Sequence, residues 1–219
     1  MDLKNKKVLV TFGPTWVSID DVRILSNRSS GEMGRRIIEK LLASGAQVTA
    51  LEGPVFLPLK KRDHLTIKKF FFYDEFKLLF LEELKRGYDI VVHAAAVSDF
   101  KPMKKFHGKI KSDKKATLVL LPTSKLIQKV KAVAPKTVLI GFKLEPSRSQ
   151  TTLKKEAMKS ILNNNCDYVV ANSISKGYTG FILNQEGTTL AGVKSKNGMA
   201  SALLKVLTNH FKKNDTSRN

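Results

Sequence analysis

Short apolar runs rich in β-branched residues alternate with segments of helical period along most of this chain. The run at 6–13 ends in Gly-Pro and predicts a buried strand, whereas apolar residues after Gly31 recur on one helical face until Ser44-Gly45. This alternation predicts an α/β fold of three layers, in which a Rossmann-like, doubly wound and mostly parallel sheet carries helices on both faces. Further strands are predicted over 46–54, 64–72, 88–96, 117–122, 136–144 and 166–172, and further helices over 74–87, 124–134, 153–165 and 198–211.

Two stretches depart from the alternation. The segment 101–115 holds seven lysines against one aspartate and has no clear period, which predicts a projecting flap over about 100–116. Residues 180–193 predict a C-terminal β-hairpin that turns at Glu186-Gly187.

Cysteine usage and hydropathy bear on the compartment. The single cysteine, Cys166, excludes an internal disulfide and a cysteine-based metal cluster, and it is expected to pack in the core. The first residues have the pattern of a strand rather than of a secretion signal, and no apolar run is long enough to cross a bilayer. We therefore expect a cytoplasmic protein with one domain over 1–212 and a disordered tail over 213–219.

The formal net charge of +20 indicates a partner rich in negative charge. Clustered Lys and Arg fit either a nucleic acid or an anionic small molecule, and solvated basic faces account for much of the excess. The aromatic residues have core spacing, as over 68–76, rather than the pattern of an exposed stacking platform. A basic nucleic-acid-binding module therefore remains an alternative, and no specific nucleic acid is expected.

The segment 26–34, SNRSSGEMG, stands between the first predicted strand and the first predicted helix. Backbone N–H groups in the first turn of a helix lack partners and the helix dipole adds positive charge, so this end attracts phosphate. Gly31 and Gly34 would allow close approach of the backbone, and Ser29 and Ser30 would supply hydroxyl groups. A cradle for an anion is predicted, although a serine that only caps the helix would give the same pattern.

A plain dinucleotide fingerprint does not fit, because a long excursion separates Gly13 from Gly31. The stretch TFGPTWVSIDDVRILSNRSSGEMG instead closely resembles the opening of the phosphopantothenoylcysteine synthetase family. HAAAVSDFKP, GKIKS, LPTSKLI, IGFKLE and CDYVVANSIS resemble later segments of that family in the same order, over roughly 8–175. GFKL and TSKL are more similar to the separate, single-domain synthetase than to the form fused to a decarboxylase.

The resemblance implies a ligase of coenzyme A biosynthesis that joins 4'-phosphopantothenate to L-cysteine. Members of that family activate the carboxylate with a nucleoside triphosphate, CTP or ATP, and release pyrophosphate from an acyl-nucleotide intermediate. The resemblance further implies Mg²⁺, a homodimer in which a partner subunit helps to close the site, and a separate flavin-dependent decarboxylase as the next enzyme. CTP is favoured over ATP, although only Lys159 remains of the lysines that the family tends to carry on the helix before 166–172.

Site residues are carried over by motif. Lys109 matches the flap lysine that neutralises charge on the phosphates in the first step, and Asn27 matches the asparagine that binds the reacting carbonyl or carboxylate. Asp99 would hydrogen-bond the nucleotide or help to hold Mg²⁺, with helix capping as its alternative, and Phe142 would lie against the base or in the core. The implied acyl-substrate site is Asn27, Ala95 and Ala96, and the implied nucleotide site is Gly13, Ser29, Ser30, Gly31, Gly34, His93, Ala94, Ala95, Asp99, Lys109, Ser124, Lys125, Leu126, Ile127, Phe142 and Lys159.

An NAD(P)-dependent reductase of the short-chain type is the other enzyme considered. Its Tyr-x-x-x-Lys spacing occurs at Tyr73 and Lys77, but the pair follows the third predicted strand, which is too early for that catalytic position. A tyrosine at a helix start explains the residue better. No clear ribose-binding acid follows the second strand unless Glu52 serves.

Overall fold

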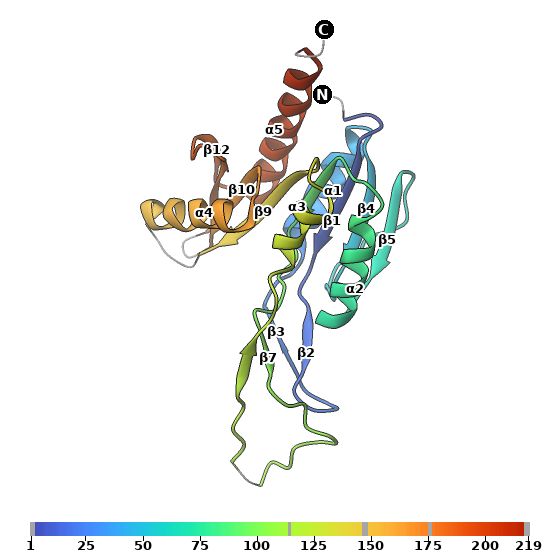
Figure 1. Ribbon diagram of the computed structural model, residues 1–219, viewed down its shortest axis with the longest axis vertical. Coiled ribbons are helices and arrows are strands. Elements are labelled where there is room, and N and C mark those ends of the chain that lie inside the picture. Colours follow the sequence, from blue (N-terminus) through green and yellow to red (C-terminus); the bar gives the residue numbers. More distant parts are fainter. Residues whose placement is uncertain (1–2, 114, 146–148, 175–176, 217–219) are drawn as a thin grey trace.

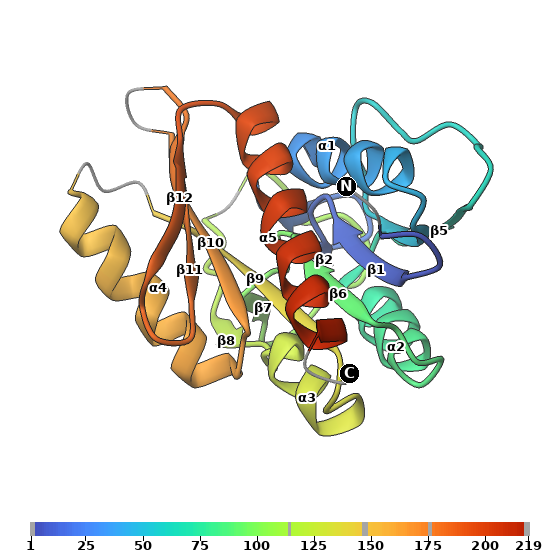
Figure 2. The same cartoon turned by 90° about the horizontal axis from the view of Figure 1, so that it is seen from above.

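The computed structural model describes residues 3–113, 115–145, 149–174 and 177–216. Its centre is an eight-stranded sheet of order β12-β11-β10-β9-β6-β1-β4-β5, flanked by helices (Figures 1 and 2). All neighbouring strands are parallel except the two pairs made by β11. The pair of β11 with β12 is the expected C-terminal hairpin. The Rossmann-like α/β class is confirmed. The strands are β1 Lys7–Phe12, β4 Gln47–Glu52, β5 Leu65–Lys69, β6 Ile90–His93, β9 Val138–Leu144, β10 Tyr168–Ser173, β11 Thr179–Asn184 and β12 Thr189–Val193.

Successive side chains of β1 enter different cores because a strand points alternate residues to opposite faces. Val8 and Val10 pack with α1 and α5 on one face, whereas Leu9 packs with α2, α3 and α4 on the other. Both faces of the central strand are therefore dry, as parallel sheets require. The helices are α1 Glu32–Ala43, α2 Tyr73–Leu84, the 3₁₀ helix η1 Leu126–Lys129, α3 Val130–Val133, α4 Gln150–Asn164 and α5 Lys196–Thr216.

An arm projects from the carboxyl edge of the sheet (Figure 1). We define the arm as residues 16–26 and 100–122. Its first part is a hairpin of β2 Trp16–Ser18 and β3 Ile24–Ser26, which the sequence did not predict, and its second part is a ribbon of β7 Phe100–Pro102 and β8 Leu120–Pro122. The projecting flap expected over 100–116 therefore belongs to a larger, two-part structure.

Three predicted boundaries were wrong. The run 117–122 is not a strand of the main sheet, because β8 pairs only with β7 in the arm and its residues are exposed. A short apolar run has the same pattern in either place, so periodicity cannot separate them. The helix predicted over 124–134 is a 3₁₀ turn followed by a single α-helical turn. The last helix continues to Thr216, well into the tail that was expected to be disordered, while 217–219 lie outside the described residues.

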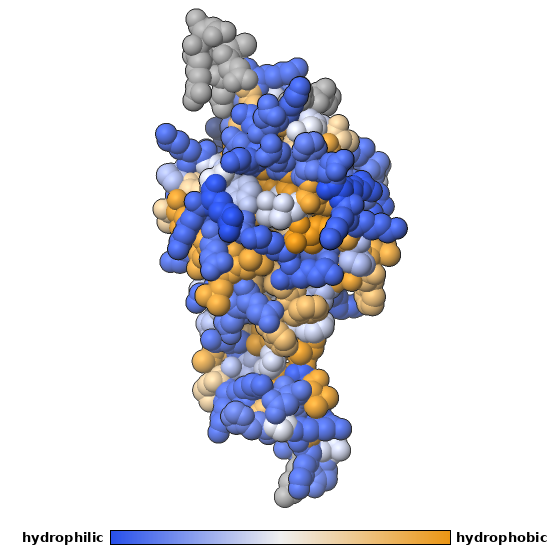
Figure 3. All heavy atoms as spheres, turned by 90° about the vertical axis from the view of Figure 1, so that its right-hand side faces the viewer, coloured by the Kyte–Doolittle hydropathy of each residue, from blue (hydrophilic) through white to orange (hydrophobic). Residues whose placement is uncertain are grey.

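Polar side chains cover most of the face shown in Figure 3, with smaller apolar areas between them. This agrees with the 26% of charged residues in the chain. Among the described helices, none combines the length and apolar character that a membrane span requires.

Candidate active site

The carboxyl ends of β1, β4, β6 and β9 lie side by side at the edge from which the arm projects. In an open α/β sheet this edge is where ligands bind. The loops that follow these strands carry most of the predicted site residues. The fold therefore gathers segments from 13–34, 94–99 and 123–127 at one place.

The anion cradle was predicted at residues 29–34, which lie at the start of α1. Gly31 precedes the helix with a φ of 72°, a left-handed conformation suited to glycine. Ser29 Oγ accepts the Gly31 N–H at 3.3 Å, and Ser30 Oγ accepts the Glu32 N–H at 3.4 Å. Both serines therefore satisfy amides of the helix start, and an anion that took over these N–H groups would release the two hydroxyls.

The glycines of the cradle have a packing role that sequence reasoning missed. A Cβ on Gly34 would lie 2.2 Å from Cβ of Phe12, and a Cβ on Gly31 would lie 2.5 Å from Cγ1 of Val55. The helix therefore lies directly against β1 and against the loop after β4. The two glycines are therefore needed for the close packing of α1 against Phe12 and Val55, and this packing fixes the start of the helix in place.

Asn27 meets the turn after β6. Its Nδ2 donates to the carbonyl oxygens of Ala96 at 3.1 Å and Val97 at 3.3 Å. Ala96 also donates its N–H to Gly13 at 2.9 Å, so the ends of β1 and β6 stay paired beyond the sheet. Asn27 thus contacts the turn that contains Ala95 and Ala96, the other two predicted acyl-substrate residues. The amide donors of Asn27 are engaged by the backbone here, and its exposed Oδ1 is an acceptor.

The side chain of His93 belongs to the core. It is almost completely buried against Phe76 and Phe80, and its Nδ1 is 3.1 Å from Oγ1 of Thr11. Burial lowers the pKa of His93 to about 4, so the imidazole is neutral at pH 7. The N–H groups of Ala94 and Ala95 donate to the carbonyl and hydroxyl oxygens of Thr11. The approach predicted at 93–95 is therefore built from carbonyl groups and methyl groups.

A second turn, 123–127, closes the other side of the edge. Lys125 forms an ion pair with Asp99, and both side chains are more than half exposed. Ser124 Oγ lies 2.8 Å from the Tyr73 hydroxyl. Tyr73 is buried in this contact, so the tyrosine considered for a reductase supports the turn instead.

Other predicted nucleotide residues differ in accessibility. Leu126 is buried in the core and presents no side chain to a ligand, whereas Ile127 and Phe142 are half-buried. Lys159 lies in α4, roughly 13 Å along the helix from Gln150, and pairs with Glu156 at 2.7 Å. One turn further along α4, the carbonyl of Asn163 accepts from Gln128 Nε2 at 3.2 Å, so this part of the helix lies beside the residues that follow the turn 123–127.

Lys109 is exposed on the arm. Its neighbour Ile110 contacts Asp20 and Arg23 at the tip of the β2–β3 hairpin, whereas Asn27 follows the base of that hairpin. The four residues from Arg23 to Asn27 span roughly 13 Å of extended strand. Within one chain, Lys109 and Asn27 are therefore not brought together.

A protein-held magnesium ion does not fit the donors at this edge. Asp99 is the carboxylate that was predicted to hold it, and that carboxylate is already paired with Lys125. No group of three or more His, Cys, Asp or Glu side chains suited to a metal occurs within the described ranges. These side chains therefore do not form a binding site for a metal ion at this edge.

Sequence reasoning also missed a buried hydroxyl network behind the site. Thr15 Oγ1 donates to Ser98 Oγ at 3.0 Å and accepts the Ser98 N–H at 2.9 Å, and Thr123 Oγ1 donates to the Ser98 carbonyl at 2.6 Å. These bonds join the three loops at the root of the arm. Thr15, Ser98 and Thr123 lie within the matched motifs, but spacing along the chain does not show that their side chains meet.

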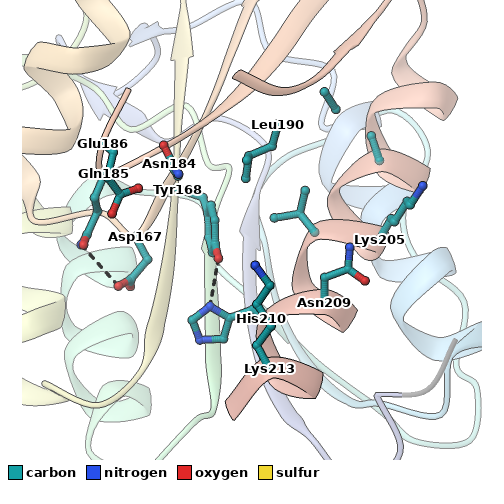
Figure 4. Close-up of a pocket in the computed structure, with 13 residues that line it drawn as sticks. Asp167, Tyr168, Asn184, Gln185, Glu186, Leu190, Lys205, Asn209, His210 and Lys213 are labelled. Atoms are coloured by element: carbon teal, nitrogen blue, oxygen red, sulfur yellow. Dashed lines mark hydrogen bonds between the residues drawn. The ribbon is translucent and has the colours of Figure 1, made fainter. Parts of the chain in front are cut away.

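A hollow of about 550 Å³ lies at the opposite end of the sheet, between β10–β12 and α5 (Figure 4). Tyr168 and His210 face each other in it, with the hydroxyl 2.9 Å from Nδ1. It sits at the amino end of β10 and contains none of the predicted site residues. The hollow is separate from the edge that carries the cradle.

Comparison with known proteins identifies the family of this chain. The family described as "DNA/pantothenate metabolism flavoprotein C-terminal domain" matches residues 3–210. A coenzyme A biosynthesis bifunctional protein CoaBC from Thermococcus kodakarensis is 39% identical over 78% of this chain and 42% of its own length. The chain spans about half the length of such curated relatives.

Two solved structures share the fold over nearly all of both chains. The DNA/pantothenate metabolism flavoprotein from Streptococcus pneumoniae is 28% identical, with a TM-score of 0.85 over 94% of this chain and 99% of that chain. The C-terminal domain of a coenzyme A biosynthesis bifunctional protein CoaBC is 25% identical, with a TM-score of 0.78 over 96% and 98%.

Proposed function

This chain belongs to the family of DNA/pantothenate metabolism flavoprotein C-terminal domains, and from that premise we propose that it joins 4'-phosphopantothenate to L-cysteine in coenzyme A biosynthesis. The meeting of Asn27 with the Ala96 turn beside the anion cradle carries the proposal. It places an amide side chain, carbonyl groups and a helix start at one edge. The decarboxylation that follows in this pathway would fall to a separate flavin-dependent enzyme, and we place both in the cytoplasm.

The chemistry explains why several anions must meet. A carboxylate is a poor acyl donor, so its oxygen attacks the α-phosphorus of CTP or ATP and the bond to pyrophosphate breaks. The amine of cysteine then attacks the acyl carbon, the nucleoside monophosphate leaves, and the nitrogen loses a proton. A carboxylate, a phosphomonoester and a triphosphate repel one another, and the N–H groups of residues 29–34 together with Lys109 and Lys125 offset that repulsion.

Asn27 would act in the second step. Release of its Nδ2 from the carbonyl of Ala96 would direct the amide donors to the acyl oxygen, where negative charge develops as the amine attacks. The side chain needs no change of protonation for this role. CTP is the favoured nucleotide, and Mg²⁺ would enter bound to its phosphates.

The active unit would be a homodimer. In one chain roughly 13 Å of extended strand separates Arg23, which contacts the segment of Lys109, from Asn27, so a lysine from a second copy would complete each site. The arm also exposes apolar side chains that a second copy would cover. These are Val22, Ile24, Phe100, Met103, Val119, Leu120 and Leu121.

Pyrophosphate release tests the proposal. With 4'-phosphopantothenate and either CTP or ATP present, one equivalent of pyrophosphate per site is expected before cysteine is added, and continuous turnover afterwards. Asn27→Asp should accumulate acyl-nucleotide, whereas Lys109→Gln should block its formation. No pyrophosphate with either nucleotide would refute the ligase assignment.

Mixed dimers test the shared site. Asn27→Asp and Lys109→Gln homodimers are each inactive in this scheme. After subunit exchange, a heterodimer contains one site with both wild-type residues, so the mixture should recover up to about a quarter of wild-type activity. If the exchanged mixture stays inactive while exchange is verified by mass, the two residues act from the same chain.

A further inference from the structure

The tip of the β2–β3 hairpin holds the backbone on both sides of Lys109. Asp20 Oδ2 accepts the Ile110 N–H at 3.1 Å, and Arg23 Nη1 donates to the Ile110 carbonyl at 3.1 Å. Asp21 Oδ2 accepts the Gly108 N–H at 2.7 Å. Lys109 itself takes no part in these bonds, and its side chain is left exposed on a segment that is otherwise tied down.

Asp20 divides its two oxygens between two tasks. Oδ1 accepts the N–H groups of Val22 and Arg23 at 2.8 and 2.6 Å, which shapes the turn at the hairpin tip. Oδ2 faces Ile110 and also accepts from Arg23 Nη1 at 2.6 Å. The side chain of Asp20 is completely buried, although it stands on a projecting arm. A buried carboxylate with every bond directed at backbone or at one guanidinium is built for rigidity.

The charge state of Asp20 suits this role. Burial alone would raise its pKa, but hydrogen bonds from the N–H groups of Ile110, Val22 and Arg23 and from the Arg23 guanidinium outweigh burial and hold the pKa well below its usual range. The carboxylate therefore accepts four bonds throughout the neutral pH range.

We infer that Asp20 is a positioning residue for the first step, which fixes the backbone at Ile110 so that Lys109 reaches the phosphates in a single orientation. This inference rests on the proposed function and adds a residue that acts through Lys109 without touching substrate. It also gives the Asp20–Arg23 pair a reason beyond turn formation. A flexible loop would carry the same charge, but it would spend little time in the reactive geometry.

Asp20→Asn is the informative substitution. Asparagine keeps one acceptor oxygen for the turn and places an N–H₂ group opposite the Ile110 N–H and the Arg23 guanidinium, so it breaks the connection to the lysine segment. Lys105→Gln is the matched control, because it removes the ion pair of Lys105 with Asp21 and leaves the backbone bonds at Gly108 and Ile110. Both variants change the charge of the arm by one unit.

Three measurements are expected to agree. Exchange of the Ile110 amide hydrogen should accelerate at least tenfold in Asp20→Asn, while amides of β1 keep wild-type rates and show that the sheet is folded. Acyl-nucleotide formation should slow at least tenfold with little change in KM for the nucleotide, and cysteine attack on preformed acyl-nucleotide should keep its rate. Lys105→Gln should leave all three unchanged. If Asp20→Asn disturbs β1, Asp20→Glu takes its place, with a smaller loss expected.

The double variant Asp20→Asn/Lys109→Gln decides whether Asp20 acts through Lys109. It should be no slower than Lys109→Gln, because a positioning residue contributes nothing once the positioned group is gone. In single-turnover measurements of the residual rate, a double variant that is tenfold slower than Lys109→Gln would overturn the inference, as would normal acyl-nucleotide formation by Asp20→Asn. A Lys109→Gln enzyme with wild-type rates would instead refute the proposed role of Lys109, and it is recognisable before Asp20 is tested.

Discussion

Replacing Gly31 by alanine should reveal how tightly the anion cradle is packed. A non-glycine residue at a φ of 72° costs roughly 1–2 kcal/mol. The added Cβ would also lie 2.5 Å from Cγ1 of Val55, and overpacking of this kind costs roughly 1–3 kcal/mol. Together these terms predict a loss of roughly 2–5 kcal/mol in the free energy of unfolding, which for a domain of this size lowers Tm by at least about 4 °C.

Gly87→Ala is the matched control. Gly87 has a φ of 71°, but no atom lies within 4 Å of where its Cβ would be, so alanine there adds backbone strain and no overlap. In urea unfolding, Gly31→Ala should cost more than Gly87→Ala by the overlap term, roughly 1–3 kcal/mol. Val55→Ala in the Gly31→Ala background should recover part of that difference. Equal losses at Gly31 and Gly87 would refute the packing argument.

Three further predictions concern buried ionisable groups. Burial lowers the pKa of His93 to about 4, so the free energy of unfolding should fall as pH drops from about 6.5 to 4, where only the unfolded imidazole is protonated. The free energy of unfolding of His93→Gln should lack this dependence on pH. Identical slopes for the variant and the wild type would contradict the prediction. Burial raises the thiol pKa of Cys166 to about 12, so a disulfide reagent should react with it only in denaturant. Lys68→Met leaves the buried Glu83 carboxylate with Arg86 and the Tyr88 hydroxyl, and it should cost roughly 1–3 kcal/mol in urea unfolding; no loss would contradict this.

The sheet could be predicted because its strands are buried on both faces. Runs such as 90–92 are continuously apolar, and only a covered sheet makes that pattern favourable. The arm could not, because β2 and β3 have three residues each, β2 is half-buried and β3 is mostly exposed, so they leave neither an apolar run nor an alternation. The run 117–122 misled for the converse reason, since it is apolar and yet lies in the arm.

The candidate site was predictable in its parts and not in its assembly. Asn27 and the Ala96 turn were named separately from motifs, and the fold joins them by a hydrogen bond. Lys109 was also named from a motif, but the order of residues along a chain does not show whether two of them act in the same subunit. The glycines at 31 and 34 were assigned to ligand approach, whereas the nearest groups are Phe12 and Val55, which no spacing rule could have revealed.

The two parts of the arm are far apart along the chain, and that affects how the protein is made. Asp20 leaves the ribosome early, while Ile110 follows after 90 more residues. At roughly 5–20 residues per second, the first hairpin waits about 4–18 s for the segment that covers its buried carboxylate. Until then its apolar side chains are open to any neighbouring nascent chain, so this hairpin is the stretch for which a chaperone should matter most.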